Sequence, residues 1–205
     1  MVEINPLRKM QAKDIEQVVD VHLKAFPGFF LSFLGSRFLQ ELYTGILSDP
    51  SGIAMVFEDD GKIIGFVAGT DQPAGFYTRL LRQRWLRFGW ASIWPVIQKP
   101  AIIPRLLRAF NTPKEADPGQ GCGTLMSIAV SPDGQSKGVG RMLVTAFLDE
   151  ATGRGLRQID LTTDKLNNDS VNAFYVRLGF KCARSYVTPE GREMNEYLIE
   201  LEQRP

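Results

Sequence analysis

The sequence predicts a single domain of the α/β (α+β) class, with helices packed around a β-sheet. The chain has 205 residues, of which 44% are hydrophobic, so it can bury one sizeable core. Residues 53–58 and 63–69 are rich in β-forming side chains, and residues 59–62 (DDGK) between them suit a tight hairpin turn. From residue 123 onward the pattern alternates in the order β-α-β-α-β-β, with no internal repeat.

The bulk composition narrows the classes of function. A formal net charge of +1 gives no global reason to expect a nucleic-acid partner. The two cysteines, Cys122 and Cys182, are too few for a disulfide framework and lack the paired spacing of a zinc site. His22 is the only histidine, which disfavours multi-histidine metal sites and Ser/His or Cys/His nucleophiles. Since the chain shows neither a signal peptide nor a membrane span of about 18 apolar residues, we expect a cytoplasmic protein without a metal.

The residue pattern of the N-terminal third of the sequence predicts a strand and two helices. Residues 4–9 are a candidate short strand. Apolar side chains at helical spacing predict a helix that begins at Asp14 and stops at residues 26–28 (FPG). The aromatic stretch 29–35 is expected to be a connection, and the spacing of apolar residues over 38–43 predicts a second helix.

Residues 72–113, which follow the hairpin, differ in composition from the rest of the chain. They contain all three tryptophans and seven basic residues but no acidic one. We therefore treat this stretch as a helical insertion between two strands.

The C-terminal elements are bounded by clear turn signals. A strand ends at residues 131–134 (SPDG), and Gly179 closes the last helix as a C-terminal glycine usually does. The predicted strands and helices, in chain order, are 123–130, 138–152, 157–163, 168–178, 180–187 and 194–201.

Residues 135–141 (QSKGVGR) connect a strand to the start of a helix, where free backbone N–H groups favour an anion such as phosphate. Gly138 and Gly140 would let a ligand approach the backbone. A Walker motif is excluded because no Gly-Lys-Ser/Thr follows, and a dinucleotide fingerprint is excluded because Leu143 occupies its third glycine position. Taken alone, two glycines at this spacing more often only shape a turn.

A second set of residues supplies the missing context. Asn168 and Tyr175 are seven residues apart, so they lie on one side of the same short helix. Gly179 then ends this helix and Phe180 returns the chain to the core. A helical tyrosine alone is more often a packing residue, but its occurrence after the glycine turn favours a binding site.

Together these segments resemble the GNAT superfamily, the Gcn5-related N-acetyltransferases. The acetyl-CoA motif of that superfamily, Gln/Arg-x-x-Gly-x-Gly/Ala, is matched by Gln135, Gly138 and Gly140. Its later motif, Asn-x-x-Ala-x-x-x-Tyr before Gly-Phe, is matched by Asn168, Tyr175, Gly179 and Phe180, with Val171 in place of Ala. The match is specific over residues 125–187.

The resemblance implies a mixed, mainly antiparallel twisted sheet flanked by helices. Strands 123–130 and 157–163 would form a splayed parallel pair that admits the pantetheine arm of acetyl-CoA. The positions implied to bind this co-substrate are Ile128, Ala129, Val130, Gln135, Ser136, Lys137, Gly138, Val139, Gly140, Arg141, Asn168 and Tyr175.

The implied reaction is direct attack of an amine on the thioester, with Tyr175 as general acid for the departing thiolate. Strand 123–130 has no acidic side chain where the family often supplies the base. Asp164 is the first candidate for that base, followed by Glu193 and His22. Each has a structural alternative, namely a helix cap, a solvated turn charge and a packed helix residue, respectively.

The expected acceptor is a small-molecule or protein amine, with no nucleic acid. The aromatic residues 26–33 would either border this acceptor or form a hydrophobic staple in the core. For the insertion at 72–113 two interpretations stand: helices packed over the acceptor side, or peripheral contact with a membrane or acidic surface. Apolar and charged residues do not separate cleanly at 100° per residue, which favours packed helices. A homodimer, a longer acyl group and a non-catalytic acyl-CoA-binding sensor or scaffold also stay open.

Overall fold

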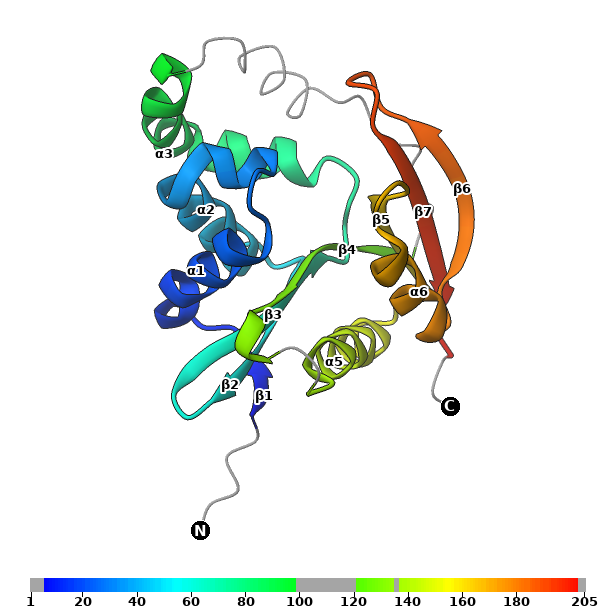
Figure 1. Cartoon of the computed structure of the whole chain (residues 1–205). Helices are drawn as coiled ribbons and strands as arrows, with labels where there is room; N and C mark the ends of the chain where they lie inside the picture. Colours follow the sequence, from blue (N-terminus) through cyan, green and yellow to red (C-terminus); the bar gives the residue numbers. More distant parts are fainter. Residues whose placement is uncertain (1–5, 99–120, 135–136, 203–205) are drawn as a thin grey trace.

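The computed structural model describes residues 6–98, 121–134 and 137–202 (Figure 1). Its strands are β1 (Leu7–Lys9), β2 (Gly52–Asp59), β3 (Lys62–Thr70), β4 (Cys122–Val130), β5 (Gln158–Asp164), β6 (Lys181–Val187) and β7 (Glu193–Glu200). Its α-helices are α1 (Ile15–Ala25), α2 (Phe30–Ser48), α3 (Phe76–Gln98), α5 (Val139–Gly153) and α6 (Asp169–Arg177), with short 3-10 turns at Ala12–Asp14 and Pro132–Gly134.

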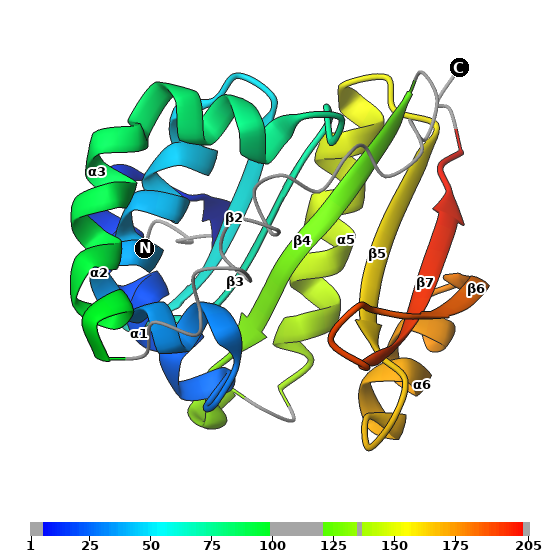
Figure 2. The same cartoon turned by 90° about the horizontal axis from the view of Figure 1, so that it is seen from above.

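The described strands form one seven-stranded sheet in the order β1-β2-β3-β4-β5-β7-β6. Every neighbouring pair is antiparallel except β4 and β5, which run parallel. The β4–β5 pairing covers only the rungs from Cys122↔Gln158 to Thr124↔Asp160, and Figure 2 shows the two strands diverging toward their carboxyl ends. The predicted fold class, including the splayed parallel pair, is confirmed.

The sheet separates two hydrophobic cores. One core lies under α1, α2 and α3, where Val18, Phe38 and Phe66 are fully buried. The other lies under α5 and includes Leu143 and Phe147 together with side chains of α6 and β7. Because both faces of the sheet are covered, the interior strand β3 is buried along almost its whole length.

The structure moves the start of the second helix. The stretch 29–35 was expected to be a connection, but α2 begins at Phe30 and continues across a break at Gly35, where φ is 86°. Glycine tolerates this left-handed backbone, so the aromatic turn before it can pack on the first core while the helix changes direction. The predicted strand 4–9 is shorter, beginning at Leu7, and its residues 4 and 5 lie outside the described part.

Within the insertion, residues 76–98 form α3, which packs along α2. The helix breaks at Arg84 (φ −131°, ψ 22°), whose guanidinium donates to Glu41 of α2 at 2.8 Å. Residues 99–113 of the insertion lie outside the described part of the chain. Among the helices that the structure describes, none has the length and apolar character needed to cross a membrane.

Candidate functional site

The site begins where β4 and β5 separate. The last paired rung joins Thr124 and Asp160, and the Thr124 hydroxyl donates a hydrogen bond to the Asp160 carboxylate. Beyond it, β4 stays paired with β3 as far as Val130 but loses its partner on the β5 side. Among the described strands, the main-chain groups of 128–130 that point toward β5 therefore have no ladder partner, which is the requirement for pairing with an extended ligand.

A bulge in β4 determines which of its side chains point to each face of the sheet near the splay. Ala68 is opposite Ser127 while Gly69 is opposite Leu125, so Met126 is the extra residue. As a result Met126 and Ser127 both point to the α1–α2 side, where Met126 packs on the first core and Ser127 bonds to Tyr43. The predicted residues Ile128 and Val130 face the α5 side.

The amino end of α5 lies beside the splay (Figure 2). Its N-cap, Gly138, has a left-handed backbone (φ 74°) and no side chain to cap the helix, and the first helical bond runs from Met142 N–H to the Gly138 carbonyl. The first-turn N–H groups of 139–141 therefore have no intrahelical acceptor. A Cβ added at Gly138 would meet no heavy atom of the described residues within 4 Å, so on that side the backbone can be approached by a ligand. The arrangement fits a bound phosphate.

The other predicted residues of this turn are only partly described. Lys137 is exposed, and its ammonium group lies 3.2 Å from the carboxylate of Asp59, whose side chain is about half exposed. Gln135 and Ser136 lie outside the described residues. A Cβ at Gly140 would be 3.5 Å from the Phe174 ring, an ordinary contact, so the packing of α5 on α6 does not by itself require glycine there.

Tyr175 lies on the same side of the sheet as this turn. Its ring is 5% exposed and packs against Phe174, Phe180 and Tyr197, with centroid distances of 5.3, 5.7 and 6.0 Å. Burial raises the pKa of the Tyr175 hydroxyl to about 12. The phenol is therefore protonated at neutral pH and can act as a proton donor.

A network of amide side chains fixes the start of α6. The Asn168 amide donates to Thr163 Oγ1 at 2.8 Å and to the Asp164 carbonyl at 2.9 Å, so both of its N–H groups are used within the protein. Asn172 donates to the carbonyls of Asp164 and Asn168 and accepts from Asn195 Nδ2 and Tyr197 Oη. Sequence reasoning did not single out Asn172, although its position four residues after Asn168 places both amides on one helix face.

Two of the three candidate bases are paired with cations. Both carboxylate oxygens of Asp164 accept from Arg192, at 2.7 and 2.8 Å from its Nη2 atom. Glu193 is 3.1 Å from the Lys165 ammonium group. The Arg192 guanidinium also lies over the Phe29 ring, 5.8 Å from its centroid, so the β6–β7 turn contacts the α1–α2 connection.

The third candidate, His22, is 3% exposed, and burial lowers its pKa to about 4. Its Nδ1 atom lies 2.7 Å from the Tyr43 hydroxyl, which lies 3.2 Å from the Ser127 hydroxyl. Its Nε2 atom is buried and has no hydrogen-bond partner among the described residues. His22 is thus neutral at physiological pH, and its hydrogen-bonded chain leads to the β4 bulge.

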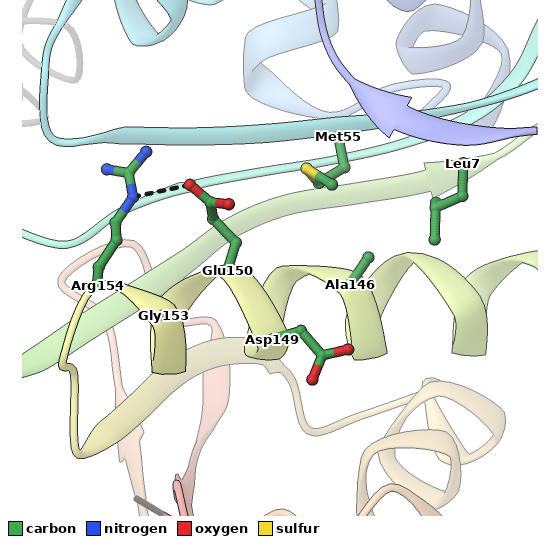
Figure 3. Close-up of a pocket in the computed structure, with 7 residues that line it drawn as sticks. All are labelled: Leu7, Met55, Ala146, Asp149, Glu150, Gly153 and Arg154. Atoms are coloured by element: carbon green, nitrogen blue, oxygen red, sulfur yellow. Dashed lines mark hydrogen bonds and ion pairs between the residues drawn. The ribbon is translucent and has the colours of Figure 1, made fainter. Parts of the chain in front are cut away.

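A separate pocket of about 440 Å³ lies between β1, β2 and the carboxyl-terminal half of α5, at the far end of that helix from Gly138 (Figure 3). It is lined by Leu7, Met55, Ala146, Asp149, Glu150, Gly153 and Arg154. The Glu150 carboxylate already accepts from Arg154 Nε at 3.1 Å and Lys9 Nζ at 2.9 Å. This pocket therefore does not belong to the site at the splay. In the described part of the chain, no cluster of His, Cys, Asp or Glu could hold a metal ion.

A sequence model of the acetyltransferase (GNAT) family matches residues 15–180, which include the splay, the α5 turn and Tyr175. The chain belongs to this family. The resemblance stated from the two motifs is thus confirmed over most of the chain, including the N-terminal helices.

Individual relatives of this GNAT chain match over shorter regions. It is 39% identical over 74 residues to [ribosomal protein bS18]-alanine N-acetyltransferase of Escherichia coli K12, covering 34% of this chain and 49% of the relative. It is 35% identical over 74 residues to mycothiol acetyltransferase of Tsukamurella paurometabola, covering 36% and 25%. The matches thus span about a quarter to a half of the length of these curated relatives.

A solved structure of similar fold is an aminoglycoside 6'-N-acetyltransferase complexed with coenzyme A. Its TM-score is 0.62 at 15% identity, and the comparison covers 97% of this chain and 98% of that chain. At this identity the comparison supports the fold alone.

Proposed function

We propose that the protein transfers an acetyl group from acetyl-CoA to an amine acceptor. The observation that carries the proposal is the arrangement at the carboxyl end of β4. There the edge of β4 that faces β5 is unpaired. The start of α5 at Gly138, which has no side-chain cap, and the buried phenol of Tyr175 lie on the same face of the sheet. Family membership gives this arrangement its chemical meaning.

The co-substrate would lie along the splay. Main-chain groups of Ile128, Ala129 and Val130 would pair with its pantetheine arm, and the N–H groups of 135–141 would bind its pyrophosphate. Asn168 would contribute only its Oδ1 oxygen, because its two N–H groups are bonded within the protein.

Bound acetyl-CoA supplies the acetyl group as a thioester. As the C–N bond to the amine forms and the C–S bond breaks, Tyr175 would give its hydroxyl proton to the departing thiolate sulfur. The amine proton leaves to solvent and the phenol is later reprotonated, so protons balance over one turnover. No covalent enzyme intermediate is required.

The route by which the amine loses its proton is limited by the state of the candidate bases, because Asp164 is ion-paired and His22 is buried. Asp164 stays a predicted base, but its ion pair with Arg192 argues against that role, since both of its oxygens already accept hydrogen bonds. His22 has a pKa of about 4 and is a weak acceptor. We therefore propose that the amine reacts as its free base or loses its proton to water.

The acceptor class remains broad within this proposal. Relatives are named for a ribosomal-protein alanine and for mycothiol, which supports either a protein amine or a small molecule. The acceptor would enter on the side of the α1–α2 connection, where Phe29 meets Arg192 of the β6–β7 turn.

A panel of amines tested with acetyl-CoA, measuring release of free thiol above the hydrolysis background, decides the function. The panel should include amino sugars, polyamines and peptides with free N-termini. We expect release with at least one acceptor class. Tight CoA binding with no thiol release for any amine would instead support the alternative, a non-catalytic acyl-CoA sensor.

A further inference from the structure

The outer face of α3 is unusually apolar for a solvated helix. Phe76, Leu80 and Phe88 on its inner face are buried in the first core. On the outer face Trp85 is 66% exposed and Trp90 is 77% exposed. Apolar residues thus stand on both sides of the helix, which explains why its sequence does not separate into one apolar and one charged face.

The exposed apolar residues in the middle of α3 follow the break at Arg84. Leu86, which is 57% exposed, precedes Trp90 by one helical turn, so these two side chains lie on one side of the helix. Trp85 follows the break directly, and the exposed Arg82 lies two residues before it. We call this set of exposed side chains the α3 outer face (Arg82, Trp85, Leu86, Arg87 and Trp90).

The charge of this face has one sign. Arg82 is exposed, and Arg87 is 67% exposed and forms a long ion pair, at 3.9 Å, with Glu41 of α2. Helix α3 has no acidic residue between Phe76 and Gln98. The face therefore combines large indole rings with cations and carries no negative charge of its own.

We propose that the α3 outer face binds the surface of a membrane that contains anionic lipid. Tryptophan rings are favoured at the headgroup level, where one side is apolar and the other is hydrated. Arginine guanidinium groups bind lipid phosphates through paired hydrogen bonds and attract an anionic surface. An acidic polypeptide would match the arginines but would leave two indoles and Leu86 in water, so the lipid surface fits the whole face better.

Binding by this face would leave the proposed acetyl-transfer site accessible. Helix α3 lies at the edge of the molecule far from α6 in both Figure 1 and Figure 2, beyond α2 and away from the diverging ends of β4 and β5. The inference does not depend on which amine is acetylated, and it is tested without turnover.

The test is co-sedimentation of the full chain with vesicles of phosphatidylcholine, alone or mixed equally with phosphatidylglycerol. We expect binding to the mixed vesicles only, weakening as salt is added. The R82Q/R87Q variant should bind roughly 30-fold more weakly, from about one factor of five to ten per arginine. W85A/W90A should weaken binding by about tenfold or more.

Control variants remove charge or apolar surface elsewhere on the molecule. K24Q/K62Q removes two exposed cations and V187A trims an exposed apolar side chain on β6, so both should bind like wild type. Absence of binding to the mixed vesicles, or binding that the α3 variants leave unchanged, would overturn the proposal. So would a dimer in light scattering that W85A/W90A dissociates, or capture by polyglutamate without vesicle binding, since these assign the face to a second copy or to an acidic protein.

Discussion

Replacing Gly138 by alanine separates a structural role of this glycine from a role in cofactor binding. Gly138 has φ 74° and Gly155, after the other end of α5, has φ 79°. At either position an added Cβ meets no atom of the described residues within 4 Å. Both substitutions therefore impose the same left-handed strain, about 1–2 kcal/mol, and should lower the melting temperature by roughly 2–8 °C in a domain of this size.

Only the Gly138 change should affect cofactor binding. Its new methyl group would project into the space that the proposed pyrophosphate occupies, beside the first-turn N–H groups of α5. Loss of one hydrogen bond to a charged group costs about 1.5–3 kcal/mol, so the CoA dissociation constant should rise roughly 10- to 150-fold. Calorimetric titration with CoA and thermal melts measure both effects. If G138A and G155A bound CoA equally well, the α5 turn would not be the pyrophosphate site.

Three further predictions follow from hydrogen bonds and pKa values in the structure. N172A removes four hydrogen bonds and should destabilise the protein by about 3 kcal/mol. N168A removes two and should cost about 1.5 kcal/mol. Urea unfolding measures both losses of stability, and equal losses would contradict the network. His22, with a pKa of about 4, is not expected to act as the base, so the amine must react as its free base. We therefore expect kcat/KM to rise with pH until the acceptor amine itself titrates. A break near pH 6.5 that is the same for two amines of different pKa would instead reveal an enzymatic base. Burial alone would raise the pKa of Asp14, but hydrogen bonds from Arg8 and the Gln11 N–H outweigh it and the pKa lies below its usual value. The stability that ionised Asp14 contributes is therefore complete above its unfolded-state pKa and is lost as pH falls through its folded-state pKa. R8M should lower the free energy of unfolding by about 3 kcal/mol at pH 7 and by less in acid. A loss of stability that does not depend on pH would refute the pairing of Arg8 with Asp14.

The features predictable from the sequence are those set by residues close together in the chain. The α5 turn needs only a strand end, two glycines and a helix start, and Tyr175 follows from the spacing within α6 and the closing Gly179. The hairpin of β2 and β3 follows from its turn residues in the same way. The splay of β4 and β5 came from the family resemblance, and the register now confirms it.

Other parts of the site depend on contacts between distant segments. Asn172 acquires its role only when β7 brings Asn195 and Tyr197 beside α6. Asp164 looks like a free base until the β6–β7 turn places Arg192 on it, 28 residues later. No local pattern encodes either contact, because each depends on how the sheet orders its strands.

The same reasoning applies to α2 and to His22. The turn before Gly35 looks like a loop in sequence because its aromatic residues lack helical periodicity, yet packing on the first core makes it helical. The low pKa of His22 depends on burial, which is provided by residues distant in the sequence such as Phe66 of β3 and Tyr43 of α2. The low pKa that makes His22 a poor base thus results from its tertiary environment and not from its residue type.

The most direct test of the proposed chemistry is Tyr175→Phe, assayed with an acceptor that the amine panel identifies. Phenylalanine keeps the ring contacts with Phe174, Phe180 and Tyr197 and removes only the hydroxyl. Loss of a general acid predicts a kcat lower by about 10²-fold or more, with the CoA dissociation constant unchanged. A kcat equal to that of wild type would contradict the role of Tyr175 as the proton donor to the departing thiolate.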